Sequence, residues 1–174
     1  MIIVLLGYMG SGKSTVGQLL AQNSNTDFLD LDEYIEQNQQ ATIAEIFKSK
    51  GEIVFRKLES EAVKDLINQS DNLVLALGGG TPCYGDTMAF LVEHPNVITV
   101  TLNSSIKNLS ERLIKEKSKR PLIASIKDED IPEFIAKHLF ERSFFYNQAE
   151  ISIQTDSLSV AEIVATIISK ITPK

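Results

Sequence analysis

Residues 1–15 read MIIVLLGYMGSGKST, and this stretch sets the architecture expected for the whole chain. Ile2 to Leu6 is a continuous apolar run rich in β-branched residues, which is typical of a strand buried on both faces of a parallel sheet. Residues 7–15 fit the pattern G-x-x-x-x-G-K-[ST] and lead into a predicted helix from Lys13 to Gln22. A strand, a glycine-rich loop and a helix in this order predict a phosphate-binding loop.

This loop has the chemistry to bind the phosphates of a nucleoside triphosphate together with magnesium. Successive backbone N–H groups can converge on one anion, and the helix that follows adds its positive N-terminal end. Lys13 can reach the β- and γ-phosphates, while the Ser14 hydroxyl can ligate Mg²⁺. The alternative is a tight turn with a solvated Lys13, a cation that the helix dipole would disfavour. The residues expected to contact the nucleotide are Gly10, Ser11, Gly12, Lys13, Ser14 and Thr15.

Short apolar runs recur along the chain with helix-length segments between them. The runs are Phe28–Leu31, Leu73–Leu77, Val97–Leu102 and Ile151–Ile153. The later predicted helices are Asp32–Gln37, Thr42–Ser49, Gly51–Gln69, Asp86–His94, Ser104–Lys115, Ile131–Asn147 and Ser159–Ile171. This alternation predicts an α/β fold with a parallel sheet. Because no repeat or linker divides the chain, residues 1–174 are expected to form a single domain, in which residues 115–130 are a mobile loop or lid.

Composition narrows the classes of function. The net charge of −6 and the pI of about 5.0 provide no positive field for nucleic acid or for an anionic membrane surface. No apolar run approaches the roughly 20 residues of a membrane helix, and no export signal is visible. Cys83 is the single cysteine, and neither His94 nor His138 has metal-ligand spacing. A cytoplasmic protein with small-molecule partners is expected.

Two acidic residues and three glycines follow predicted strands. Asp30 and Asp32 close the second strand on one face, where one can orient a magnesium-bound water and the other a substrate hydroxyl. The alternative is that Asp32 only caps the helix that follows. Gly78, Gly79 and Gly80 come after the third strand, where absent side chains let a ligand touch the backbone, unless they form merely a flexible connection.

Arginine is scarce in this chain, with four among seventeen basic residues. A planar guanidinium clamps an anion through two hydrogen bonds, so scarce arginines point to anion sites. The alternatives are surface ion pairs, such as Arg56 with Glu52 or Glu59 and Arg112 with Glu116. The four are Arg56, Arg112, Arg120 and Arg142.

Taken together, these segments resemble the shikimate kinase family over nearly the whole chain. The resemblance implies ATP-dependent phosphorylation of the 3-hydroxyl of shikimate, a step of aromatic amino-acid (chorismate) biosynthesis. It also implies a three-layer α/β/α fold with a five-stranded parallel sheet, of the P-loop kinase type, with a closing lid. The matching segments are Gly7–Thr15, Asp30-Leu31-Asp32 with Ile35-Glu36, Glu52–Glu59 containing Phe55-Arg56, Gly78-Gly79-Gly80, and Arg120-Pro121-Leu122 with Glu141-Arg142 and Tyr146.

The resemblance assigns roles to individual residues. Lys13, Asp32 and Arg120 would be catalytic, with Asp32 orienting the acceptor hydroxyl and Arg120 reaching the transferred phosphate from the lid. Arg112 would lie along the adenine, and Asp30 would hold Mg²⁺ through water beside the direct ligand Ser14. The residues implied in holding shikimate are Asp32, Arg56, Gly78, Gly79, Gly80 and Arg142.

Three other functions were weighed against this one. A gluconate-kinase-like enzyme would share the loop and sheet but phosphorylate another hydroxy acid. A regulatory GTPase is disfavoured because no N-K-x-D or D-x-x-G motif follows the loop. A non-catalytic nucleotide-binding module is disfavoured by the intact Lys13, Ser14, Asp32 and Arg120. One departure from the family is that residues 155–157 lack its frequent basic residue near the adenine. The expected partners are ATP and shikimate, and the expected state is a monomer.

Overall fold

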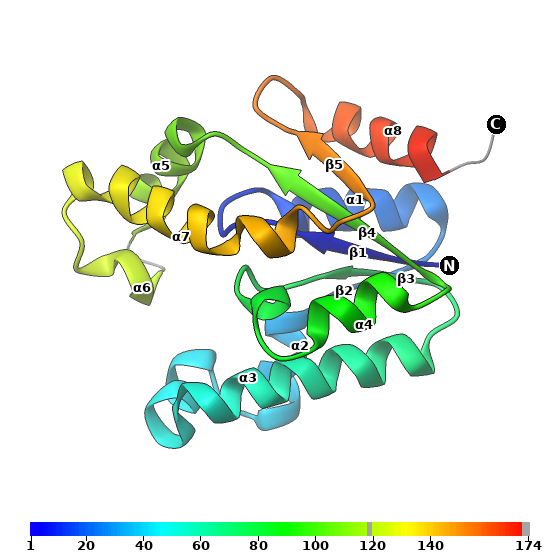
Figure 1. Cartoon of the computed structure of the whole chain (residues 1–174), viewed down its shortest axis with the longest axis horizontal. Helices are drawn as coiled ribbons and strands as arrows, with labels where there is room; N and C mark the ends of the chain where they lie inside the picture. Colours follow the sequence, from blue (N-terminus) through cyan, green and yellow to red (C-terminus); the bar gives the residue numbers. More distant parts are fainter. Residues whose placement is uncertain (118–119, 172–174) are drawn as a thin grey trace.

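Five parallel strands form one sheet at the centre of the molecule (Figure 1). The structure is a computed structural model that describes residues 1–117 and 120–171. In space the strands run in the order β2-β3-β1-β4-β5, with β1 in the middle. All five residues of β1 are buried, as predicted for a strand covered on both faces. The bounds are β1 Ile2–Leu6, β2 Asp27–Asp30, β3 Leu73–Ala76, β4 Val97–Asn103 and β5 Ile151–Gln154.

Helices cover both faces of this sheet, which makes the predicted three-layer α/β/α arrangement correct. Helices α2 (Leu31–Gln39), α3 (Ile43–Gln69) and α4 (Thr87–Glu93) lie on one face, and α1 (Lys13–Ser24) and α8 (Val160–Ile171) lie on the other (Figure 1). Alternate residues of each central strand feed the two layers of core, because neighbouring side chains of a strand point to opposite faces. Because all five strands are parallel, their carboxyl ends lie along one edge of the sheet.

A third apolar cluster lies beyond the sheet, between the phosphate loop and the helices that carry Arg112 and Arg142. These helices are α5 (Ile106–Lys115) and α7 (Ile131–Tyr146), which lie together in Figure 1. The predicted loop at residues 115–130 is only partly irregular, since it contains α6 (Pro121–Ala124) and the 3₁₀ turn η3 (Asp128–Asp130). Residues 118 and 119 lie outside the described residues. The buried members of the cluster are Tyr8, Leu109, Leu113, Ile123, Ile131 and Ile135.

Helix α3 joins the two helices that the sequence predicts over residues 42–49 and 51–69. It begins with a capping box, in which Thr42 and Glu45 exchange hydrogen bonds. It changes direction at Gly51, whose φ of 80° and ψ of 169° are not helical. The predicted break is correct, because glycine adopts this positive φ without steric cost. Within residues 1–117 and 120–171, no helix combines the length and the apolar character needed to cross a bilayer.

The junction of β2 and α2 corrects the expected placement of the two acidic residues. The strand ends at Asp30 and α2 begins at Leu31, so Asp32 is the second residue of the helix and does not lie on the strand. Asp30, not Asp32, is the N-cap, because its Oδ1 accepts a hydrogen bond of 3.1 Å from the backbone N–H of Asp32. Strand alternation therefore does not bring the two carboxylates together; the cap at the start of the helix does.

Candidate active site

The phosphate loop closes at the carboxyl end of β1 and delivers its amides to the start of α1. Gly7 approaches β4 so closely that a Cβ there would lie 2.6 Å from the carbonyl oxygen of Leu102. Gly12 is the N-cap of α1 and has a φ of 93°, which strongly favours glycine. The Lys13 ammonium donates to the carbonyls of Gly7 at 2.8 Å and Tyr8 at 3.1 Å. Its charge therefore lies over the loop that would cradle phosphate.

Lys13 and Asp32 perturb each other in this setting. Burial lowers the pKa of Lys13 to about 8, although the carboxylates of Asp32 and Asp30 oppose this shift. Burial also raises the pKa of Asp32 to about 6, helped by the negative charges of Asp30 and Glu59 and opposed by Lys13. A carboxylate with a pKa near 6 is a better proton acceptor near neutral pH than an ordinary aspartate.

Ser14 and Asp30 supply an oxygen pair suited to Mg²⁺. The Ser14 hydroxyl donates to Oδ2 of Asp30 at 2.6 Å. Magnesium is usually held by one or two protein oxygens together with waters and substrate phosphates. The described residues contain no group of three or more His, Cys, Asp or Glu arranged to hold a metal. These two side chains fit a magnesium ion whose other ligands come from a bound nucleotide and from water.

The three glycines after β3 make room for side chains of the site. A Cβ at Gly78 would lie 3.0 Å from Oδ1 of Asp32 and 3.1 Å from Oε1 of Glu59. At Gly80 it would lie 2.9 Å from Nη1 of Arg56, and at Gly79 it would lie 3.4 Å from Nη1 of Arg142. A contact below about 3 Å is repulsive, so a side chain at position 80 would displace the Arg56 guanidinium, and the distances of 3.0 and 3.1 Å leave little room for one at position 78. The glycines thus let both predicted arginines approach one short segment of backbone.

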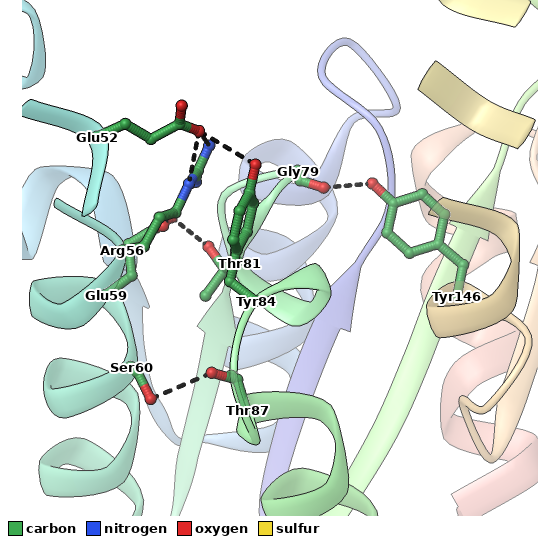
Figure 2. Close-up of polar contacts among 9 residues, drawn as sticks. All are labelled: Glu52, Arg56, Glu59, Ser60, Gly79, Thr81, Tyr84, Thr87 and Tyr146. Carbon is green, nitrogen blue, oxygen red and sulfur yellow. Dashed lines mark hydrogen bonds and ion pairs between the residues drawn. The ribbon is translucent and has the colours of Figure 1, made fainter. Parts of the chain in front are cut away.

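Arg56 is held by a network of acidic and aromatic side chains, drawn in Figure 2. Its Nη1 donates to the buried carboxylate of Glu59 at 2.6 Å, and its Nε and Nη2 donate to Oε1 of Glu52 at 3.4 Å each. The ion pairs considered as the alternative role of Arg56 are therefore present. Glu59 is itself fixed, because its Oε1 accepts from the Thr81 hydroxyl at 2.5 Å. Arg56 is a charged group presented at the edge of the site.

Arg142 comes from α7 and lies over the ring of Tyr8, with its Cζ 5.3 Å from the ring centroid. Tyr146 lies one turn further along α7, and its hydroxyl donates a hydrogen bond to the Gly79 carbonyl, drawn as a dashed line in Figure 2. Both Arg142 and Arg56 act electrostatically on the Cys83 thiol, whose pKa burial nevertheless raises to about 11. The two guanidinium groups thus converge on Gly79, Gly80 and η1 (Thr81–Cys83).

The remaining two arginines lie near the phosphate loop. Arg112 donates from Nη1 to the Gly10 carbonyl at 3.0 Å, so the expected pair with Glu116 is replaced by a contact with the loop itself. Glu116 instead accepts from Arg120 at 2.6 and 3.0 Å. The Arg120 charge helps to depress the pKa of Lys13, which puts it in electrostatic reach of the loop. Both cations therefore lie near the phosphate loop.

Sequence reasoning missed several members of the site. It treated Glu59 only as an ion-pair partner, although this carboxylate is 2% exposed and touches two elements of the site. It gave no role to Tyr84, which stacks on Arg56, or to His138, whose Nδ1 lies 2.9 Å from the Tyr8 hydroxyl. The i,i+3 spacing of Arg56 and Glu59 was the only local signal, because the other contacts join distant segments.

Comparisons with known proteins agree with this geometry. A family model described as shikimate kinase matches residues 9–172. The shikimate kinase of Flavobacterium johnsoniae is 48% identical over 166 residues, which are 95% of this chain and 96% of that relative. The family model begins inside the phosphate loop, at residue 9, and includes the glycine segment and all four arginines.

Solved structures give the same result. The crystal structure of shikimate kinase from Bacteroides thetaiotaomicron superposes with a TM-score of 0.90 at 34% identity, covering 98% of this chain and 97% of that one. Shikimate kinase from Acinetobacter baumannii, solved in complex with shikimate, gives 0.86 at 32% identity, covering 98% and 92%. A gluconokinase from Sinorhizobium meliloti gives 0.56 at 18% identity, which shows a shared fold alone.

Proposed function

The chain belongs to the shikimate kinase family, and we propose that it transfers the γ-phosphoryl group of ATP to the 3-hydroxyl of shikimate at the carboxyl edge of its sheet. The observation that carries this proposal is the convergence of two different anion sites. Asp32 lies close both to the partly buried lysine of the phosphate loop and to the glycine segment at which two arginines meet.

The arginine pair is suited to the shikimate carboxylate. Arg56 and Arg142 both border the backbone of Gly79 and Gly80, where the absence of side chains leaves a planar anion access to two guanidinium groups. Gly78 belongs to the same site because it leaves space for Asp32. Charge-assisted hydrogen bonds at this end would fix the ring so that its hydroxyls face the phosphate loop.

Asp32 orients the acceptor hydroxyl and receives its proton. As the bond from the substrate oxygen to the γ-phosphorus forms, the bond from that phosphorus to the β–γ bridging oxygen breaks, and the hydroxyl proton passes to the Asp32 carboxylate. Because the transition state of phosphoryl transfer is loose, this proton need not leave early. A pKa of about 6 keeps Asp32 ionised at neutral pH and close enough to neutrality to accept the proton.

Cations stabilise the charge that develops on the transferred group. Lys13 lies at the loop, and Arg120 would exchange its pair with Glu116 for the γ-phosphate when residues 115–130 close as a lid. Mg²⁺ bound at Ser14, with Asp30 reaching it through water, would supply Lewis-acid stabilisation of the phosphates. Arg112 would lie along the adenine from its place beside Gly10.

A coupled ADP-release assay tests the proposal. Turnover should require shikimate and fall by more than about 100-fold in Lys13→Ala and Asp32→Asn, while Arg56→Ala should chiefly raise the KM for shikimate. Gluconate should give no turnover. A response to gluconate alone would contradict the assignment, and nucleotide binding without turnover on either acid would favour a non-catalytic module. We also propose a cytoplasmic, single-domain monomer. The free thiol of Cys83 supports the cytoplasmic location, and the one continuous sheet supports a single domain.

A further inference from the structure

The ring of Tyr84 is the closest aromatic contact of Arg56. The guanidinium carbon lies 4.3 Å from the Tyr84 ring centroid, compared with 5.4 Å for Phe55 and 5.9 Å for Phe47. A guanidinium stacked on an aromatic face is attracted by the ring quadrupole and is restrained in its plane. Tyr84 comes from the segment after η1, so it reaches Arg56 from a different element than the acids on α3.

Tyr84 also touches the weaker of the two acidic partners. Its hydroxyl donates to Oε1 of Glu52 at 3.1 Å, and the same oxygen accepts the two 3.4 Å contacts from Arg56, as Figure 2 shows. Contacts of 3.4 Å are at the long limit of hydrogen bonding, so Glu52 holds the Nε and Nη2 edge of Arg56 loosely. The short bond to Glu59 fixes only Nη1. The Tyr84 ring lies against the guanidinium at 4.3 Å and is a further contact that can restrain its plane.

We propose that Tyr84 is a positioning residue that holds the Arg56 guanidinium in the orientation that receives the substrate carboxylate. The inference rests on the proposed function, in which Arg56 binds that carboxylate. An arginine whose guanidinium is not held in place samples many rotamers. Its apparent affinity for a ligand is then reduced by the fraction of time spent in the rotamer that can bind. Tyr84 raises that population without touching the reacting atoms.

The setting of Tyr84 makes this role separable from folding. Its side chain is 43% exposed, in contrast to the buried residues of the sheet layers. Tyr84 borders a hollow of about 400 Å³ between α3 and residues 84–85. Truncating the ring would therefore widen an existing hollow at the surface instead of creating a cavity in the core. The hollow is lined by Glu52, Ile53, Arg56, Lys57, Ser60, Tyr84 and Gly85.

Steady-state kinetics on Tyr84→Ala and Tyr84→Phe test the proposal. Tyr84→Ala should raise the KM for shikimate about tenfold and leave kcat and the KM for ATP within about twofold, because a lost cation–π contact weakens only the acid site. Tyr84→Phe keeps the ring and should restore the KM to within about twofold of the unmodified protein. Phe140→Ala, at a side chain that is 84% exposed, is the matched control and should change neither constant.

A double-mutant cycle with Arg56→Ala separates positioning from other roles. In the Arg56→Ala background, Tyr84→Ala should have no further effect on the KM for shikimate, because nothing remains to be positioned. An equal rise in both backgrounds, or no rise in the single variant, would overturn the inference. If Arg56→Ala itself leaves this KM unchanged, the carboxylate role of Arg56 in the proposed function fails as well. If only Tyr84→Ala is silent, the proposed function stands and the positioning role falls.

Discussion

Replacing Asp32 by asparagine should stabilise the protein while removing most of its turnover. The half-buried carboxyl has its pKa raised from the ordinary 3.8 to about 6, so the folded state disfavours the charged form. A shift of roughly two units corresponds to about 3 kcal/mol at neutral pH, and solvent screening at a partly exposed side chain reduces it to about 1–3 kcal/mol. Asparagine has nearly the same shape as the neutral acid and carries no charge.

The sign of this effect depends on pH in a defined way. Below about pH 3 the aspartic acid is mostly neutral in both the folded and the unfolded chain, so the substitution should gain little. As the pH rises from about 4 to 6, the unfolded chain ionises first, and the destabilising effect of Asp32 grows to its full size. Above about pH 6 the difference should be constant. The pKa of about 6 already includes the attraction of Lys13, which lowers the pKa of Asp32.

Urea denaturation of the two proteins at pH 4.5 and pH 7.5 measures the difference. The variant should gain about 1–3 kcal/mol at pH 7.5, or a few degrees in Tm, and much less at pH 4.5. Glu33→Gln, at the exposed neighbouring position, is the control and should show neither change. Equal stability of Asp32→Asn and the unmodified protein at pH 7.5, or the same gain at both pH values, would refute the electrostatic reasoning.

Three further outcomes follow from the site. The value of kcat/KM should fall below about pH 6, where Asp32 is protonated, and above about pH 8, where Lys13 loses its proton. Initial rates measured from pH 5 to 9.5 check this prediction, and a flat profile would contradict it. Gly80→Ala should raise the KM for shikimate at least about tenfold and leave the KM for ATP unchanged, because the added Cβ would lie 2.9 Å from Nη1 of Arg56. An unchanged KM for shikimate would argue against carboxylate binding by Arg56. Ser14→Ala should raise the magnesium concentration for half-maximal rate by roughly tenfold or more, measured by titrating Mg²⁺ at fixed ATP, and an unchanged requirement would remove Ser14 from the metal site.

Features encoded in local sequence were predictable. The phosphate loop follows from the spacing of its glycines and lysine, and the parallel strands follow from apolar runs whose bounds shifted by only one or two residues in the structure. The break was predicted between Ser49 and Gly51, and the structure places the non-helical residue at Gly51 itself. Chain direction alone then brings the carboxyl ends of the strands to one edge.

The local geometry of Asp30 and Asp32 was not predictable from periodicity. The run from Phe28 continues through the apolar Leu31, which extends the apparent strand past its true end at Asp30. Leu31 is instead a buried residue of the first turn of α2, where its apolar side chain serves the helix layer equally well. Capping by Asp32 was considered only as the alternative to a functional role, and residue type could not point to Asp30 instead, because aspartate caps well at either position.

Contacts between distant segments lay beyond sequence reasoning. Tyr84 is 28 positions from Arg56, and Tyr8 is 130 positions from His138, so no helical or strand spacing relates them. The region after β5 is another case. Asp156 accepts hydrogen bonds from Ser104, Ser105 and Asn108, which ties this loop to the start of α5 and holds the pKa of Asp156 near 2. These hydrogen bonds give Asp156 a structural role.

A crystal structure of the protein with ADP, Mg²⁺ and shikimate tests the two-anion geometry most directly. The diphosphate should lie within hydrogen-bonding distance of the amides of residues 10–15, and the shikimate carboxylate should lie between Arg56 and Arg142 with its 3-hydroxyl toward Asp32. A carboxylate bound away from both arginines, or a diphosphate outside the loop, would contradict the proposed site.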